Sequence, residues 1–528
     1  MLTLNHSGRQ GLNFPQRQST IMNAKSLILA LACMAFALGC NEEDLVQLDP
    51  NNVTPENYFA LESQVESGIF AAYSVQQGVN LGSRLYFFLN DLRGGELVGT
   101  QALIGSLPRF LNGTSLATDG EVNAYWTALY QMVHYSNTTL EGIARNRARG
   151  AEGLDPDVLD ALEGEARFLR GWAYNELATH YGGVPIYTSV VTSVDGAQPR
   201  SSEAETFDFA QADLLFAAEN LPLTRMGDDL GRATSGAAYA ILGRSHMQEN
   251  ELDAAKTALE AVVDSDVYAL VDDYDELFTE ENGFLSENIY EIVFAPIGDF
   301  DWGGTGSGAD SKNVRAQEYG PAWHNVQPNV EFMRLFANEA CGDDYTDPRF
   351  NSVFLFQGDE IANGAGTYEP NQNGTTVDYC GSEVYPGVYK YGVYYKEVPG
   401  GYRTTSTNIQ IMRYADVLLL LAEIEARQGD EDTARDYLNE VRDRVGAPTI
   451  DDDVSGNDLL RAVQYERTVE LALEQIRWRD LKRWRDAGIL PSEYELSSFE
   501  PNDRVLPIPQ DEIVNNTNIS QSDQNPGY

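Results

Sequence analysis

The spacing of apolar residues predicts two helical blocks in this chain, over residues 55–264 and 410–487. In both blocks apolar side chains recur at the three- and four-residue steps that place them on one face of a helix. Residues 265–409 break this period with prolines, glycines and short strand-like runs such as Ile289–Phe294 and Val388–Tyr395. The pattern therefore predicts a mainly α protein with a large, irregular, loop-rich insertion that contains short β segments, and with a C-terminal tail over residues 488–528.

One helical hairpin occurs twice in these blocks. The matched pairs are Gly243 with Ala422, Asn250 with Gly429, Ala255 with Ala434, Leu259 with Leu438 and Val262 with Val441. Small residues let antiparallel helices approach closely, and Asn or Gly at the turn accepts a left-handed backbone. We therefore predict a tetratricopeptide-like scaffold whose hairpins stack on one another, with weaker copies in residues 122–147 with 157–180 and in 456–474 with 476–487.

The N-terminus carries a secretion signal. The apolar run Leu27–Leu38 is too short for the roughly 20 residues of a membrane span, but it suits a signal peptide that ends at Gly39-Cys40. We predict that residues 1–39 are removed, with Met22 as the natural start, and that Cys40 is lipidated. Residues 40–54 then form a tether, and residues 55–528 form one domain. Ordinary cleavage that leaves Cys40 unmodified is the alternative.

The charge of the chain excludes one class of partner. Its 81 acidic and 36 basic residues give a formal net charge of −45. Such a surface repels nucleic-acid phosphates, so nucleic-acid binding is not expected. Excess carboxylate is typical of proteins that stay hydrated in high salt, where charges are screened over a few ångströms.

Two cysteines remain after the signal peptide and the lipid site are set aside. Cys341 and Cys380 would lie outside the cytoplasm, where a disulfide between them is the favoured prediction. A pair of buried free thiols is the alternative.

A series of short motifs runs in order through nearly the whole mature chain. They are Gly164–Arg170, Tyr181–Pro185, Gly231–Thr234, Lys390-Tyr391, Met412–Leu418 with Ala422-Glu423, Val441–Arg444, Glu466-Arg467 with Glu470-Leu471, Arg477–Trp484, Pro507–Ile513 and Gln524–Tyr528. In this order, behind a lipidation signal, the chain resembles the SusD/RagB family of outer-membrane nutrient-binding lipoproteins. One departure is Gln475, where that family often has glycine, at the junction of two helices.

Most charged motif residues are expected to be structural. Glu466, Glu470 and Glu474 recur at helical spacing and are expected to pair with arginines from other helices. An arginine partner lowers the pKa of a carboxylate and holds it ionised, which is poor preparation for general acid catalysis. The residues predicted to have this structural role are Glu165, Arg167, Arg170, Arg413, Asp416, Glu466, Arg467, Glu470, Arg477 and Asp480.

The sequence contains no recognisable catalytic or cofactor motif. A nucleophile elbow, a His-Glu-x-x-His zinc motif and a phosphate-binding loop are all missing from it. The acidic residues Asp299, Asp301 and Asp343-Asp344-Asp347 do not have the spacing of a calcium loop. We therefore predict no enzyme activity, no metal and no cofactor.

Sugar binding needs an aromatic face with amide or carboxylate groups around it. Trp126, Trp172, Trp478 and Trp484 lie on helical stripes and are expected in the core. Trp302 and Trp323 fall in the insertion and are the preferred platforms. The complete set of predicted ligand-binding residues is Trp302, Trp323, Tyr86, Asn90, Asp91, Asn325 and Tyr385. Tyr86, Asn90 and Asp91 are expected in a loop after the first helix.

The resemblance implies a cell-surface lipoprotein that captures oligosaccharides and passes them, as a hinged lid, to a TonB-dependent outer-membrane transporter. A peptide-binding receptor of the same family is one alternative. A tetratricopeptide adaptor that only docks proteins is another, and a surface hydrolase is a third.

Overall fold

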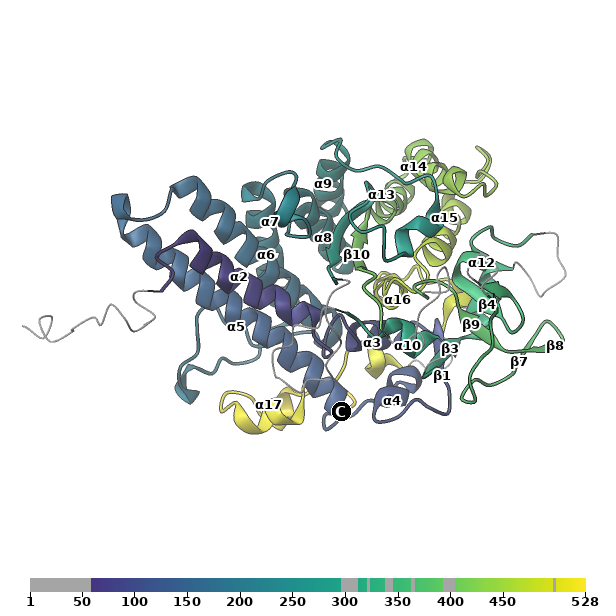
Figure 1. Ribbon diagram of the computed structural model, residues 1–528, viewed down its shortest axis with the longest axis horizontal. Coiled ribbons are helices and arrows are strands. Elements are labelled where there is room, and N and C mark those ends of the chain that lie inside the picture. Colours follow the sequence, from purple (N-terminus) through teal and green to yellow (C-terminus); the bar gives the residue numbers. More distant parts are fainter. Residues whose placement is uncertain are drawn as a thin grey trace, which may run out of the picture. The chain divides into compact units, whose positions relative to one another are not determined.

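The computed structural model describes residues 58–295, 312–320, 323–337, 345–361, 366–392, 404–496 and 500–528. Its long helices follow one another as a stack, each packed on the next. They are α2 (Glu62–Gln77), α5 (Gly120–Ala148), α6 (Pro156–Tyr181), α7 (Glu203–Asn220), α8 (Ser235–Gln248), α9 (Leu252–Val263), α13 (Tyr414–Gln428), α14 (Glu431–Arg444) and α15 (Gly456–Glu470). Figure 1 shows α2, α5 and α6 on one side of this stack and α13, α14 and α15 on the other. The predicted helical-hairpin fold is confirmed.

The two matched hairpins are α8 with α9 and α13 with α14. At their turns Asn250 has φ +63° and Gly429 has φ +92°, so both predicted turn residues are left-handed. A Cβ added to Gly243 would lie only 2.5 Å from Leu259 Cγ, so this glycine permits close contact of α8 with α9. The predicted repeat is thus confirmed in its helices and in its turns.

The insertion leaves the stack between α9 and α13, which nevertheless pack on each other. Strand β2 (Asn288–Ile292) pairs antiparallel with β10 (Ile409–Arg413), so the two ends of the insertion meet. Further short antiparallel pairs join β1 (Leu97–Gly99) to β3 (Val326–Pro328), β4 (Phe354–Phe356) to β9 (Pro386–Val388), β5 (Glu360–Ile361) to β6 (Gly366–Thr367) and β7 (Val377–Tyr379) to β8 (Ser382–Val384). The expected run Val388–Tyr395 is wrong as a strand, because β9 ends at Val388 and Tyr391 has φ +61°.

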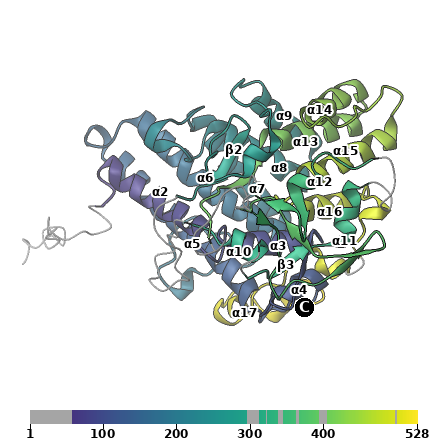
Figure 2. The ribbon, with the colours of Figure 1, turned by 45° about the vertical axis from the view of Figure 1, so that its right-hand side comes forward.

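Short helices complete the described chain. They are α3 (Leu85–Arg93), α4 (Leu107–Asn112), α10 (Arg315–Tyr319), α11 (Val330–Phe336), α12 (Phe350–Val353), α16 (Arg477–Asp486) and α17 (Gln510–Asn515). In both ribbon views α3, α10 and β3 lie together (Figure 2), so the first short helix after α2 packs beside the insertion.

Buried ion pairs join the insertion to the stack. Glu470 on α15 accepts hydrogen bonds from Arg413 at 2.6 Å and Arg349 at 2.7 Å, and from Arg444. Arg413, at the start of α13, also pairs with Glu474 at 2.7 Å. Charges removed from water are stable only when paired and hydrogen-bonded, so this group fixes how the insertion meets α13, α14 and α15.

A neighbouring lysine belongs to the same network. Lys390 Nζ donates to Glu474 Oε1 at 2.7 Å, to the Ala472 carbonyl at 2.8 Å and to the Tyr274 hydroxyl at 2.8 Å. Burial lowers the pKa of Lys390 to about 8, against the opposing effect of Glu474. The Lys390-Tyr391 motif therefore contributes a buried anchor of the insertion.

The other predicted structural residues form further ion pairs, apart from Arg477. Arg467 binds both Asp416 and Asp480 at 2.8 Å. The remaining pairs are Glu466 with Arg349, Glu165 with Arg232, Arg167 with Glu163 and Arg170 with Asp213. Arg477 was expected to pair with a carboxylate but instead donates to the Gly94 carbonyl at 3.0 Å and packs against the Phe332 ring.

The turn of the second hairpin provides a test of the repeat. Gly429→Ala places a Cβ on a left-handed backbone with nothing within 4 Å to clash, so strain alone should destabilise the protein, by about 1–2 kcal/mol. Gly429→Asn should retain most of the stability, because Asn tolerates this conformation as it does at position 250. The measurement is urea unfolding. Equal unfolding midpoints for the Ala and Asn variants would contradict the argument.

The buried pairs predict acid sensitivity. Burial alone would raise the pKa of Glu423, but Arg483, which binds it at 2.6 Å, acts together with Arg467 and Trp484 to lower that pKa to about 2. The pKa of this Glu in the unfolded chain is near 4.5, so between pH 2 and pH 4.5 the unfolded chain binds more protons than the folded protein. The stabilisation, roughly 3 kcal/mol, is therefore complete above about pH 4.5 and lost as the pH falls towards 2. We expect the free energy of unfolding to drop steeply across this window.

The matched variants are Glu423→Gln and Asp432→Asn. Glu423→Gln removes the carboxylate charge that binds Arg483, which then keeps only Asp480 as a buried ionic partner, so the variant should lose about 3–5 kcal/mol at neutral pH and show a smaller further drop in acid. Asp432 is an exposed partner of Arg435, and its replacement should change little. Identical pH profiles for Glu423→Gln and the parent would refute the assignment.

Candidate functional site

The turn before β3 presents an aromatic side chain to solvent. Trp323 is 40% exposed. The four tryptophans predicted for the core, Trp126, Trp172, Trp478 and Trp484, are each at most 4% exposed, so that prediction is confirmed. An indole face in this position is suited to stacking on the apolar side of a flat or cyclic ligand.

Hydrogen bonds from three segments hold this turn. The backbone N–H groups of Trp323 and His324 both donate to the Gln317 carbonyl in α10, at 2.9 and 3.2 Å. The Thr100 hydroxyl, just after β1, donates to the His324 carbonyl at 2.5 Å, and Asn373 Nδ2 donates to the Trp323 carbonyl at 3.0 Å. The indole is thus carried on a fixed backbone, which reduces the ordering that a ligand would have to impose.

The loop of residues 371–375 borders the turn and is fixed to β3. Gln327 Oε1 accepts hydrogen bonds from the backbone N–H and the hydroxyl of Thr375, both at 3.0 Å. Asn371 and Asn373 on this loop are half-buried and Gln372 is exposed. Amide side chains therefore border the turn that carries Trp323, and such groups serve hydroxyl-rich ligands as both donors and acceptors.

An ion pair between half-buried Arg84 and buried Glu318 supports the turn. Arg84 Nε donates to Glu318 Oε1 at 2.7 Å, and Asn325 Nδ2 donates to Glu318 Oε2. Burial raises the pKa of Glu318, and Arg84 opposes that rise. Burial also lowers the pKa of His324 to about 4, so its imidazole is neutral at pH 7. Asn325 is 6% exposed and bonds to Glu318, and its predicted contact with ligand stays a prediction.

The prediction of a ligand-facing loop at Tyr86, Asn90 and Asp91 is wrong as to local structure. These residues lie in α3, and each is at most 1% exposed. Asp91 accepts a hydrogen bond from the Tyr319 hydroxyl at 2.5 Å, and Asn90 Nδ2 donates to the Tyr86 carbonyl at 2.8 Å. Burial raises the pKa of Asp91 to about 6, against the effect of Arg315. Asp91 thus links α3 to α10 through Tyr319, and α10 in turn carries the carbonyl that holds the Trp323 turn.

The remaining predicted residues are only partly described. Tyr385 lies between β8 and β9 and is half-buried, and its role stays a prediction. Cys380 takes part in a disulfide. Trp302, Cys40 and Cys341 lie outside the described residues, as do Asp299, Asp301, Asp343 and Asp344, so the Cys341–Cys380 pairing and the lipidation also stay predictions.

Sequence reasoning missed Thr100, Asn371 and Asn373. Each lies far from Trp323 in the chain, and the one signal in the sequence was the run of amide residues 371–373. Within the described residues, no group of three or more His, Cys, Asp or Glu side chains is arranged to hold a metal ion. None of the helices in that part of the chain has the length and apolar character needed to cross a bilayer.

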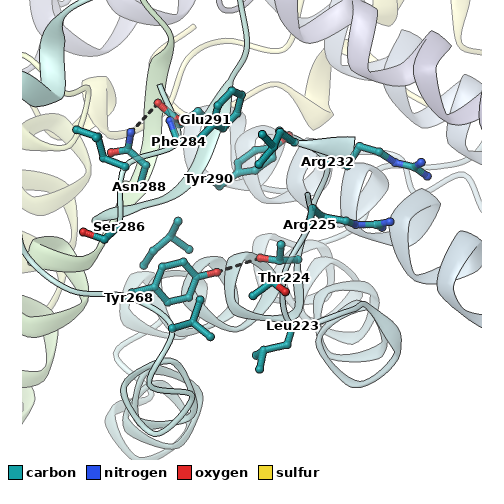
Figure 3. Close-up of a pocket in the computed structure, with 16 residues that line it drawn as sticks. Leu223, Thr224, Arg225, Arg232, Tyr268, Phe284, Ser286, Asn288, Tyr290 and Glu291 are labelled. Atoms are coloured by element: carbon teal, nitrogen blue, oxygen red, sulfur yellow. Dashed lines mark hydrogen bonds between the residues drawn. The ribbon is translucent and has the colours of Figure 1, made fainter. Parts of the chain in front are cut away.

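A cavity of about 210 Å³ lies elsewhere, between the loop after α7 and residues 267–291. Figure 3 shows the Tyr268 and Phe284 rings on opposite sides of it, with Arg232 directed away. Tyr268 bonds Thr234 at 3.1 Å, and Glu291 accepts from Asn288 at 2.9 Å. Burial raises the pKa of Glu291 to about 7. These polar groups already have protein partners, which favours a structural role.

Two family models match the chain. A model described as "Starch-binding associating with outer membrane" matches residues 106–247, and one described as "SusD family" matches residues 287–528. SusD-like protein P2 of Formosa agariphila is 25% identical, with 96% of this chain and all of that protein covered.

Solved structures are similar at the level of the fold. A SusD homologue from Bacteroides thetaiotaomicron has a TM-score of 0.73 at 19% identity, with 92% of this chain and all of that chain covered. A "Laminarin binding SusD-like protein" has a TM-score of 0.69 at 24% identity, with 88% of this chain and 99% of that chain covered.

Proposed function

Because this chain belongs to the SusD family, we propose that it is a non-catalytic receptor that captures glycan at the outer surface of the cell. The observation that carries the proposal is Trp323, which is 40% exposed on a turn held by hydrogen bonds from three segments. A pyranose offers an apolar face to such a ring, while the amide groups of residues 371–373 bind its hydroxyls. Binding energy comes from stacking and hydrogen bonds, and no bond in the glycan is cleaved.

The receptor acts together with a TonB-dependent transporter. In this proposal the helical stack rests on the extracellular face of the transporter and closes over it as a lid, so capture is followed by closure and transfer. The lipid on Cys40 keeps the receptor beside its partner. Support comes from the Gly39-Cys40 signal and from the family description, which names association with the outer membrane.

The second candidate is a peptide-binding receptor of the same family. Its side-chain requirements overlap with those of a glycan receptor, because aromatic and amide groups also bind extended peptides. One exposed tryptophan bordered by neutral amides favours the glycan, since peptide carboxylates and amines would gain more from charged groups at the platform.

The platform is tested with the full-length protein, solubilised in detergent and applied at high salt to an array of glycans and peptides. Trp323→Ala should raise the dissociation constant of the bound glycan roughly 30-fold, the effect of losing a central aromatic contact. Trp323→Phe keeps a ring and should give an intermediate value. The measurement is isothermal titration with the glycan that the array selects.

Leu215→Ala is the matched control for this substitution. Leu215 lies on α7 and is 44% exposed, so its truncation removes a comparable exposed apolar side chain away from the turn. Its affinity should equal that of the parent. Unchanged glycan binding by Trp323→Ala, or binding of peptides alone, would exclude this glycan platform.

The anchor is tested by Cys40→Ser. Without the thiol no lipid is attached, so the protein should move from the membrane fraction to the soluble fraction, because buried acyl methylenes contribute about 0.8 kcal/mol each. Affinity purification of the parent from outer membranes should recover a TonB-dependent transporter. A membrane-bound Cys40→Ser protein would refute lipidation, and a purified parent without a transporter would refute the partnership.

A further inference from the structure

One face of α5 borders a cavity. Residues at three- and four-residue steps line this cavity, so they form one continuous stripe of the helix. The stripe consists of Asn123, Trp126, Tyr130, Val133, His134 and Asn137. A helix stripe rich in aromatic rings is normally covered by another element, and here its outward neighbours are the segment of residues 187–191 and helix α17.

Aromatic rings form the floor of the cavity. The Trp126 and Tyr130 ring centroids are 4.9 Å apart, and the Tyr130 and Tyr187 centroids are 5.8 Å apart. Trp126 is almost fully buried, while Tyr130 and Tyr187 are half-buried. Tyr130 donates its hydroxyl to the Pro185 carbonyl at 2.7 Å, which fixes the orientation of its ring. The two tyrosines therefore offer the accessible aromatic surface.

The wall opposite α5 is held in place by side chains of α5. Asn137 Nδ2 donates to the Tyr187 carbonyl at 2.9 Å, and Asn137 Oδ1 accepts from Arg170 at 2.7 Å. Glu141 Oε1 accepts from the Val190 backbone N–H at 2.8 Å. These bonds fix both ends of residues 187–190, so this wall of the cavity is a segment held in place by hydrogen bonds to α5.

Helix α17 is fixed as well. The Gln510 backbone N–H donates to the Ala117 carbonyl at 2.8 Å, and Asn516 Nδ2 donates to the Gln198 carbonyl at 2.9 Å. This places Asp511, Glu512 and Asn515 around the cavity, whose volume is about 420 Å³. That volume is in the lower part of the ~300–1,000 Å³ range of small-ligand sites.

We propose that this cavity is a second glycan-binding site, which takes a short segment of a neutral oligosaccharide. It shares no residue with the Trp323 turn. The rings of Tyr130 and Tyr187 stack on the sugar. Asn515 and Asp511 bind its hydroxyls, and Asn123, which donates one hydrogen bond to Asp511 at 3.2 Å, offers its remaining amide atoms. The inference rests on the proposed function, and it extends that function to a receptor that holds its glycan at two places.

The chemistry of the cavity favours a neutral sugar over other ligands. Thr127, Ser189 and Asn515 supply exposed neutral groups that both donate and accept hydrogen bonds. Asp511 and Glu512 make an anionic ligand unfavourable, since their charge would repel it. A purely apolar ligand would leave these polar groups without water or partners.

The test uses the full-length Trp323→Ala protein in detergent, so that binding at the first surface does not contribute. The probes are maltotriose, laminaritriose, cellotriose, mannotriose and xylotriose, measured by isothermal titration and by soaking crystals. We expect at least one trisaccharide to bind with its ring against Tyr187. Adding Tyr187→Ala to the Trp323→Ala protein should raise the dissociation constant of that trisaccharide roughly tenfold or more.

A second variant tests the site without removing a wall residue, so that the result does not depend on whether Tyr187→Ala folds. Thr127→Trp starts from an exposed position on α5 and fills the cavity without removing a wall, so it should abolish the binding that remains in Trp323→Ala. Gln131→Trp is the matched control, since Gln131 is exposed on the same helix and does not line the cavity. It should leave binding unchanged.

Two results would overturn the second site: no trisaccharide binding by Trp323→Ala, or equal binding by its Thr127→Trp and Gln131→Trp derivatives. Different results contradict the proposed function: the unmodified protein binds no glycan, or Trp323→Ala alone leaves glycan affinity unchanged. Both sites are supported if the Trp323→Ala protein keeps some glycan binding and the further substitution Thr127→Trp removes it.

Discussion

The buried ion network around Glu470 is the constraint on which the rest of the structure depends. Arg413 ends β10 and directly precedes α13, the first helix after the insertion, and it binds Glu470 and Glu474 through 2.6 and 2.7 Å contacts. Arg349 reaches the same Glu470 from within the insertion. Each of these charges is stable out of water only while its partners stay in place, so removing one leaves the others uncompensated. The network therefore acts more to select one arrangement of insertion and stack than to add net stability.

This constraint separates support from binding in the Trp323 region. Half-buried Arg84 pairs with buried Glu318, and buried Asp91 accepts a hydrogen bond from Tyr319, so these polar contacts hold α3 against α10. Trp323, carried above them, keeps its indole partly exposed. A platform fixed in this way loses little conformational entropy when a ligand stacks on it. The cavity beside α5 follows the same principle, because Asn137 and Glu141 fix the backbone of its wall and leave Tyr187 beside the open volume.

Helical periodicity was sufficient to predict the stack, since Gly429 and Asn250 mark turns that local sequence alone determines. It was also sufficient to assign Trp172 and Trp478 to the core. It failed at α3, where nine residues are too few for a clear period and where Asn90 and Asp91 suggested exposure. The burial of Asp91 depends on hydrogen bonds from Tyr319 and Gln475, which are distant in sequence. The cavity beside α5 was beyond prediction for the same reason, because its walls come from residues near 123–137, 187–191 and 511–515.

Gln475 stands at a position where glycine is expected, and its side-chain hydrogen bonds offset the backbone strain. The resemblance leads one to expect glycine here, and the backbone is indeed left-handed, with φ +64°. A non-glycine residue in this conformation costs about 1–2 kcal/mol. Its side chain accepts a hydrogen bond from Arg315 at 2.8 Å and donates to Asp91 at 3.1 Å, contacts that glycine cannot make. A net gain of about 0.5–1.5 kcal/mol for each such bond is enough to offset the strain. The junction of α15 and α16 is thereby bonded to α3 and α10, the two helices that support the Trp323 turn, so in this chain the stack and the candidate binding surface share a buried residue.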